Sequence, residues 1–270
     1  MSPAPTASVS AELAAVLRRL KLGQMLDTLP ERLTLARQSQ LPHADFLEMV
    51  LTDEIARRDR TSATLRARVA HLDATMVAEG WDDTAKVTYD KAMWAELTTL
   101  RFVQDAANAL ILGPVGVGKT FLATALGHIA CRRRYSVHFE RADRLHKRLK
   151  ATRLDATHEA EIRKLMRVDL LILDDFALQR LDATETADFY QLVVERHRRA
   201  STVITSNREP AEMLAMMADP LLAQSAIDRL QSAAFELIVE GESYRHRQKP
   251  VVGAPPETDG TGPPKRRGRP

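Results

Sequence analysis

The feature that most constrains this chain is a glycine-rich loop, GPVGVGKT at residues 113–120, which directly follows the apolar run ALIL. An apolar run that leads into such a loop and then into a helical pattern predicts a strand, a phosphate-binding turn and a helix. Glycines at 113, 116 and 118 let consecutive backbone N–H groups point into one concavity. The helix that follows adds the positive end of its dipole. The motif therefore predicts binding of a nucleoside triphosphate.

Two side chains at the end of this loop have predicted roles. Lys119 is placed to reach the β- and γ-phosphates, and the Thr120 hydroxyl is placed to hold Mg²⁺. We therefore expect ATP and Mg²⁺ as cofactors. The expected phosphate-binding residues are Gly113, Pro114, Val115, Gly116, Val117, Gly118, Lys119, Thr120 and Phe121.

Length and composition indicate a folded protein of about two domains, because 270 residues with 44% apolar content can build one sizeable core and a smaller module. No run approaches the roughly 18 apolar residues needed to span a bilayer, and the N-terminus lacks a secretory pattern. The single cysteine, Cys131, falls in an apolar helical pattern and is expected in the core. We expect a cytoplasmic protein without membrane contact.

Basic residues are clustered, although the net charge is only +3. Each cluster alone is typical of a solvated helix face, whereas three together favour contact with nucleic-acid phosphates. The second and third clusters fall at residues 132–134 and 144–153. The first supplies the candidate DNA-binding residues Arg57, Arg58, Arg60, Arg66 and Arg68.

Periodicity divides the chain into five parts. Residues 1–10 are small and polar and are expected to be disordered. Apolar spacing over 11–72, punctuated by Gly23, Pro30 and Pro42, predicts a small helical module, either an arm for DNA binding and self-association or a bundle that packs on the next domain. Residues 73–105 form a connector whose Trp81, Tyr89 and Trp94 are expected to fill a core seam. An ATPase domain over 106–249 and a disordered basic tail over 250–270 complete the chain.

The ATPase region alternates strand and helix patterns, which predicts an α/β fold with a parallel sheet covered by helices. The expected strands are residues 108–112, 136–140, 170–173, 202–205 and 235–239.

Polar residues follow two of these strands. Asp174 and Asp175 end the run LLILDD, 55 residues after Lys119, so an adjacent strand can present Asp174 beside the phosphate loop. There a carboxylate holds Mg²⁺ through its waters, and Asp175 can polarise the attacking water. Asn207, at the end of VITSN, can orient that water or sense the γ-phosphate. A polar strand end is common, so this third signal depends on its companions.

Two arginines are candidates for stabilising the charge of phosphoryl transfer. Arg229 stands near the end of a helical stretch and Arg245 follows GESY. If Arg229 acts in a neighbouring subunit, hydrolysis requires assembly. A surface ion pair is the alternative.

The motifs GPVGVGKT, LLILDDF, TSN, DRL and GESYR occur in an order and spacing that resemble the IstB-like ATPases, AAA+ helper proteins of bacterial insertion sequences related to the helicase loader DnaC. The similarity spans about residues 13–247. It implies an AAA+ P-loop NTPase, a three-layer sandwich preceded by a small all-helical domain. It also implies Walker B roles for Asp174 and Asp175, sensor roles for Asn207 and Arg245, and an arginine-finger role for Arg229.

The resemblance also implies partners: ATP-dependent homo-oligomers on duplex DNA that recruit or stimulate an integrase-type transposase. The aspartate at 175, where most AAA+ proteins have glutamate, implies slow turnover. The tail departs from the usual family end in KRRGRP, where Arg267 and Arg269 resemble the core of a minor-groove AT-hook. Two other functions remain open: a helicase loader and, less favoured, a small-molecule kinase.

Overall fold

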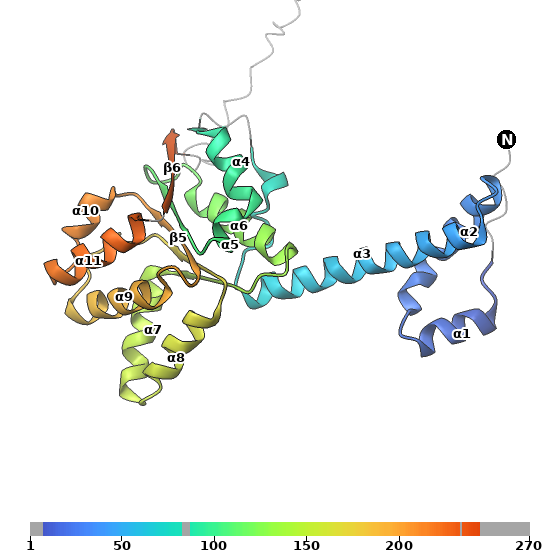
Figure 1. The fold of residues 1–270 in the computed structure, drawn as a ribbon, viewed down its shortest axis with the longest axis horizontal. Helices are drawn as coiled ribbons and strands as arrows, with labels where there is room; N and C mark the ends of the chain where they lie inside the picture. Colours follow the sequence, from blue (N-terminus) through green and yellow to red (C-terminus); the bar gives the residue numbers. More distant parts are fainter. Residues whose placement is uncertain (1–7, 83–86, 233, 244–270) are drawn as a thin grey trace, which may run out of the picture.

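The computed structural model describes residues 8–82, 87–232 and 234–243, which form an α/β body and a helical arm (Figure 1). The body is built on one six-stranded sheet with strand order β1-β6-β2-β5-β4-β3. Its strands are β1 (Val87–Tyr89), β2 (Asn108–Leu112), β3 (Val137–Arg141), β4 (Leu170–Asp174), β5 (Ser201–Ser206) and β6 (Ala234–Gly241).

Five of these strands are parallel, and they are the five that the sequence predicts. The expected α/β class and parallel sheet are therefore confirmed. The sixth strand, β1, was not predicted and pairs antiparallel with β6, with Thr88 opposite Glu240. At three residues, β1 is too short to produce an alternating apolar pattern of its own.

The sheet is the middle of three layers, because successive strand side chains point to opposite faces. In β2, Ala109 and Ile111 join one core, whereas Leu110 and Leu112 join the other. The first core lies under α4, α5, α6 and the end of the arm, and the second under α7 to α11. These helices are α4 (Lys91–Thr99), α5 (Arg101–Gln104), α6 (Lys119–Arg132), α7 (Ala142–Leu154), α8 (His158–Arg167), α9 (Ala183–Arg196), α10 (Pro210–Leu214) and α11 (Pro220–Gln231).

The arm is dominated by one long helix that stands out from the body (Figure 1). Its far end carries a small core of Leu17, Met25, Leu29 and Val50. Pro30 lies in the first turn of α2 and Pro42 caps α3, as their helix-starting preference suggests. The elements are α1 (Ala11–Arg19), the 3-10 helix η1 (Gly23–Asp27), α2 (Leu29–Gln38) and α3 (His43–Val69).

The near end of α3 is fixed to the body. Ala67, Ala70 and Leu72 are buried in the core that also contains α6. The Arg66 guanidinium donates to the Cys131 carbonyl at 2.9 Å, and the Phe139 N–H donates to the Ala70 carbonyl at 2.9 Å. The last turn of the arm thus covers the outer edge of β3. In the described part of the chain, no helix is both long enough and apolar enough to cross a bilayer.

Candidate nucleotide site

The phosphate loop leaves β2 through three residues with positive φ. These are Gly113 at 147°, Gly116 at 89° and Gly118 at 95°. A Cβ on Gly113 would lie 1.9 Å from the Val239 carbonyl oxygen, so neighbouring strand β6 leaves no room for a side chain. The loop passes into α6 at Lys119.

The Lys119 side chain is buried inside the loop, with 6% of its surface exposed. Its ammonium donates to the carbonyls of Gly113 at 2.7 Å and Pro114 at 2.6 Å. Since both acceptors belong to the loop, the charge is centred on the concavity that the loop encloses. A phosphate entering there meets a cation that the loop itself orients.

Asp174 is the point where β4 meets the phosphate loop. The Thr120 hydroxyl donates to its carboxylate at 2.9 Å, and the Thr205 hydroxyl donates to the same oxygen at 2.6 Å. Burial raises the pKa of Asp174, and the charge of Asp175 raises it further, while the two hydroxyls act in the opposite direction. The structure thus brings together the two residues that the sequence assigned to Mg²⁺.

These residues fit a magnesium ion. Mg²⁺ prefers hard oxygen ligands and is usually bound through one or two carboxylates, water and substrate phosphates. Thr120 and Asp174 supply a hydroxyl and a carboxylate on one side of the loop. Among the described residues there is no group of three or more His, Cys, Asp or Glu that would form a complete metal cage. Such a site would need a nucleotide to complete it.

Thr205 is a residue of this site that sequence reasoning missed. It is fully buried, and besides bonding Asp174 it accepts a hydrogen bond from the Asp175 backbone N–H at 2.9 Å. Its place at the end of β5, beside Asn207, was the available signal. A single hydroxyl therefore fixes both aspartates relative to the sheet.

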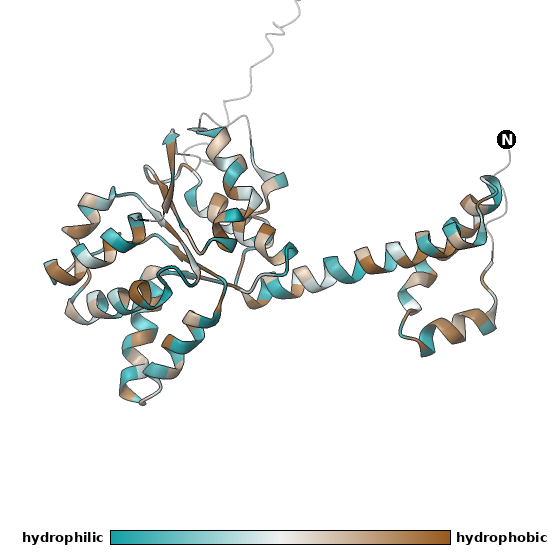
Figure 2. Cartoon of the chain, in the orientation of Figure 1, coloured by the Kyte–Doolittle hydropathy of each residue, from teal (hydrophilic) through white to brown (hydrophobic). Residues whose placement is uncertain are grey.

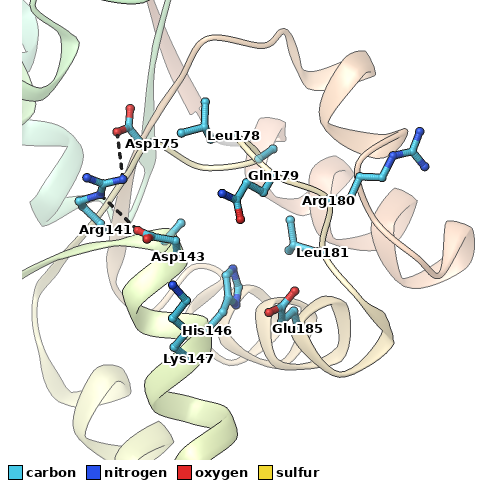
Figure 3. A pocket seen from close by; sticks show the side chains of 12 residues that line it. Arg141, Asp143, His146, Lys147, Asp175, Leu178, Gln179, Arg180, Leu181 and Glu185 are labelled. Carbon is cyan, nitrogen blue, oxygen red and sulfur yellow. Dashed lines mark hydrogen bonds and ion pairs between the residues drawn. The ribbon is translucent and has the colours of Figure 1, made fainter.

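Asp175 has a strained backbone, with φ of 54° in the left-handed region that non-glycine residues seldom adopt. Arg141, at the end of β3, lies 3.9 Å from its carboxylate and 3.2 Å from that of Asp143 (Figure 3). Strain of this kind persists only where the surroundings impose it, and it is concentrated at functional sites. Arg141 was not among the residues predicted from the sequence.

A cavity of about 520 Å³ opens above the phosphate loop. The exposed Asn207 lies on its rim together with Asp175, so the third sequence signal is close to the second. The cavity is also lined by Met76, Trp81 and Val87. It is large enough for a nucleotide-sized ligand.

Trp81 has a more specific place than the core seam expected for it. Its ring contacts Phe121 edge-on, with centroids 5.4 Å apart, and Tyr89 at 5.6 Å. It also lies over the phosphate loop, since a Cβ on Gly118 would be 2.9 Å from it. The ring is half-buried and forms a wall of the cavity, which gives a nucleoside base an aromatic face to stack on.

A smaller cavity of about 90 Å³ adjoins the first and shares Arg141, Asp175 and Leu178 with it (Figure 3). His146 lines it from α7. Its two ring nitrogens are buried and have no hydrogen-bond partner in the described chain. Burial lowers the pKa of His146, so the neutral imidazole is favoured there.

The two arginine candidates have different outcomes. Arg229 lies on α11, where its guanidinium donates to the carbonyl and the hydroxyl of Ser225, and it does not line either cavity. The structure therefore does not bring Arg229 to the site of its own chain. Arg245 lies outside the described residues, as do Arg267 and Arg269.

The candidate DNA-binding arginines of α3 differ in their contacts. Arg57 and Arg58 both bond the buried Glu54, and these contacts hold the pKa of Glu54 down to about 2. Arg66 is engaged with the body through Cys131. Arg60 and Arg68 are exposed and are the two that remain available to a partner.

Comparison with known proteins agrees with the nucleotide site that the geometry indicates. The family described as IstB-like ATP binding protein matches residues 15–251, which is most of the chain. The chain belongs to this family.

Individual members of the IstB-like family cover nearly the whole chain. A protein named as an ATP-binding protein in an insertion sequence of Mycobacterium tuberculosis is 37% identical over 88% of this chain and 95% of its own length. The insertion sequence IS21 ATP-binding protein of Pseudomonas aeruginosa is 33% identical over 90% of this chain and 91% of its own.

Solved structures support the fold. The crystal structure of DnaI is similar with a TM-score of 0.53 at 19% identity, covering 61% of this chain and 90% of that one. At this identity the likeness concerns the fold alone. The predicted α/β sandwich with a parallel sheet, preceded by a helical region, is thereby confirmed.

Proposed function

We propose that this chain is an ATPase of insertion-sequence transposition that assembles on duplex DNA and there recruits or stimulates an integrase-type transposase. The observation that carries the proposal is the contact between Thr120 and Asp174, because it joins the phosphate loop to the acidic strand end beneath one cavity. The names of the relatives, which are ATP-binding proteins of insertion sequences, support the biological setting. We place this activity in the cytoplasm.

The roles follow from the positions. Lys119 binds the β- and γ-phosphates, and Thr120 and Asp174 hold Mg²⁺, which neutralises charge on the phosphates when bound. Asp175 accepts a proton from the attacking water, and Asn207 orients that water from the rim of the cavity. Asp175 reaches less far than a glutamate would, and it is also paired with Arg141. Slow turnover in the isolated chain is the consequence.

Arg229 acts on the nucleotide of a neighbouring copy. Its distance from both cavities of its own chain supports this role, because a guanidinium supplied by a second subunit makes hydrolysis depend on assembly. For Arg245, the family resemblance of GESYR supports a role as second sensor of the nucleotide.

DNA binding rests on the exposed cations. Arg60 and Arg68 on α3, with the basic tail that contains Arg267 and Arg269, offer charges to backbone phosphates. Arg57, Arg58 and Arg66 contribute mainly by holding the arm in shape, because each is engaged within the chain.

The first test compares Asp175→Asn with Asp105→Asn, a matched change at an exposed carboxylate outside both cavities. We expect Asp175→Asn to bind ATP normally and to hydrolyse it about 10²-fold more slowly or worse, measured in the presence of duplex DNA. Asp105→Asn should match the wild type. Unchanged turnover in Asp175→Asn would rule out the assigned base.

The second test mixes two inactive variants. Arg229→Ala retains the base and Asp175→Asn retains the arginine, so a mixed assembly contains intact sites only if Arg229 serves a neighbouring copy. We expect the mixture to regain part of the ATPase activity that each variant lacks alone. A mixture as inactive as its components would restrict Arg229 to its own helix.

The helicase-loader reading is set aside because the likeness to replication proteins is at the level of the fold. It would return if the purified chain bound a replicative helicase and failed to bind an integrase-type transposase on DNA.

A further inference from the structure

One buried polar side chain beside the nucleotide site has no role in the mechanism described so far. His146 is 6% exposed, and neither of its ring nitrogens has a hydrogen-bond partner in the described chain. Figure 2 shows hydrophilic residues along much of α7, and among those whose side chains the structure describes, only His146 has buried polar atoms that no neighbour satisfies. Buried polar atoms without a partner are costly, and in a native protein they indicate a bound water, ion or ligand.

His146 lines the small cavity of about 90 Å³ that adjoins the nucleotide cavity. The two cavities share Arg141, Asp175 and Leu178, so the small cavity lies directly beside the proposed catalytic base. A volume of this size holds several water molecules or one small anion, and it is too small for a nucleotide.

Hydrogen-bond donors surround the small cavity. Figure 3 shows His146 and Lys147 extending from α7 into the space that Gln179 faces from the loop after β4, whereas the Arg180 guanidinium is turned away. Lys147 forms no ion pair within the described residues, so its charge is available to a ligand. Arg141 adds a guanidinium at the boundary with the nucleotide cavity. These groups favour an anion.

The N-terminus of α7 opens on the same cavity. Its first-turn residues Ala142 and Asp143 line the wall, and no side chain caps the helix. The N–H groups of a first turn have no acceptor within their own helix, and the helix dipole is positive there. Phosphate and sulfate groups bind at such helix ends. The helix end and the unpartnered His146 are independent observations, and both indicate an oxyanion.

Carboxylates in the wall restrict which oxyanion fits. Asp143 lies 3.2 Å from Arg141, and Glu185 is paired with Lys150 at 2.8 Å. These carboxylates disfavour an anion that only accepts hydrogen bonds, whereas dihydrogen phosphate carries two protons and can also donate. A neutral imidazole likewise offers one donor and one acceptor. Phosphate therefore matches both nitrogens of His146, while sulfate, which has no proton near neutral pH, matches only one.

We propose that the small cavity is a binding site for inorganic phosphate, the product cleaved from ATP, and that His146, Lys147 and the N-terminus of α7 hold it. The proposal rests on the ATPase function proposed above, because the phosphate enters from the nucleotide cavity. No covalent bond changes in the small cavity: water has already displaced ADP from the γ-phosphorus beside Asp175, and the phosphate then moves sideways. Phosphate that leaves by this route does not have to pass the bound ADP.

The first test measures phosphate binding without hydrolysis. The protein is saturated with ADP and Mg²⁺ and titrated with inorganic phosphate in a calorimeter. We expect Lys147→Gln and His146→Phe each to weaken binding at least several-fold. Arg144→Gln is the matched control and should bind as the wild type does, because Arg144 is exposed on α7 and lines neither cavity. Binding that is absent from the wild type, or unchanged in Lys147→Gln, overturns the proposal, and this exposed substitution is decisive if His146→Phe does not fold.

Sulfate tests the match between donors and acceptors. It has the shape of phosphate without its protons. In the same titration at slightly acidic pH, where dihydrogen phosphate predominates, we expect sulfate to bind at least several-fold more weakly. Equal binding of the two anions would overturn the assignment to phosphate.

Transient kinetics tests whether the bound phosphate comes from ATP. In a single turnover with duplex DNA, total phosphate is measured after acid quenching and free phosphate with a fluorescent phosphate-binding protein. We expect free phosphate to lag behind total phosphate in the wild type, and the lag to shorten at least several-fold in Lys147→Gln while cleavage keeps its rate. The absence of a lag in the wild type would overturn the role as a product site.

The two proposals can fail separately. Cleavage of ATP together with phosphate binding that does not respond to Lys147→Gln rejects the site in the small cavity and leaves the ATPase assignment intact. Phosphate binding that depends on Lys147 in a chain that cleaves no ATP rejects the ATPase assignment and leaves a site that fills from solution.

Discussion

At the scale of single residues, the site depends on one hydroxyl as much as on its charges. Thr205 bonds both the Asp174 carboxylate and the Asp175 N–H, and it is fully buried. Water therefore cannot replace it when it is removed. Its contribution is to keep a crowded, desolvated carboxylate ionised and correctly directed.

Thr205→Val keeps the shape and removes these bonds. We expect the free energy of unfolding to fall by about 1–3 kcal/mol, because the buried Asp174 carboxylate and the partly buried Asp175 N–H each lose a hydrogen bond. The pKa of Asp174, already raised by burial, should rise further because the hydroxyl lowers it. Metal binding needs the ionised carboxylate, so Mg²⁺-dependent ATP binding should be lost at a higher pH than in the wild type when the pH is lowered.

The measurement is a titration of ATP binding against pH in both proteins. Thr88→Val, an exposed change on β1, is the control and should leave the profile unchanged. Superimposable profiles for Thr205→Val and wild type would show that Thr205 does not tune the carboxylate.

At the scale of elements, the phosphate loop is shaped by the strand beside it. β6 pairs with β2 and brings the Val239 carbonyl against Gly113. The left-handed turn is thus required by packing between strands as well as by the ligand. A sequence motif that is usually explained by phosphate binding has a second, structural cause here.

Gly113→Ala should destabilise the fold by about 3 kcal/mol, since a Cβ would meet the Val239 oxygen at 1.9 Å with φ at 147°. Gly23→Ala is the matched control. There the nearest atom is Cγ of the flexible Arg18 side chain at 3.3 Å, and the effect should stay below about 1 kcal/mol. Chemical denaturation of both variants gives the comparison, and equal stabilities would refute the packing argument.

Some parts of the site could be predicted from the sequence and others could not, and this difference has a physical reason. The loop at 113–120 and the strand ending at Asp174 carry their chemistry in adjacent residues, so their local patterns were sufficient. Thr205, Arg141 and Trp81 join the site through contacts with elements 30 or more residues away, which no local pattern records. The same holds for β1, whose strand character depends on pairing with β6.

The arm illustrates the same limit. Apolar spacing predicted helices over 11–72, and the structure has helices there. Spacing alone does not separate the face of α3 that meets the body from the face that stays exposed, because both contain small or apolar residues. Only the placement of α6 distinguishes Ala67 from Val69.

At the scale of the whole molecule, arm and body share one core. Leu72 is buried beside α6 and lies within 2.8 Å of where a side chain on Gly127 would begin. The arm therefore packs along α6, the helix that begins at the end of the phosphate loop. A change at this joint should be felt throughout the chain.

Leu72→Ala should lower the free energy of unfolding by about 2–4 kcal/mol through the cavity it leaves. Circular dichroism reports all helices, and fluorescence reports Trp81 and Trp94 of the body. We expect both signals to shift together to lower denaturant. Leu154→Ala, at a 93% exposed site, should change neither. A shift in only one signal would mean that arm and body unfold separately.

The hydrogen bond from the Phe139 N–H to the Ala70 carbonyl covers the edge strand β3, which would be open in the body without the arm. Outer strands with open amides recruit strands from other molecules and seed aggregates. A fragment that starts after Leu72 would expose both the outer edge of β3 and an apolar face of α6. We expect this truncated fragment to be insoluble. The end of the arm therefore also protects the body against aggregation.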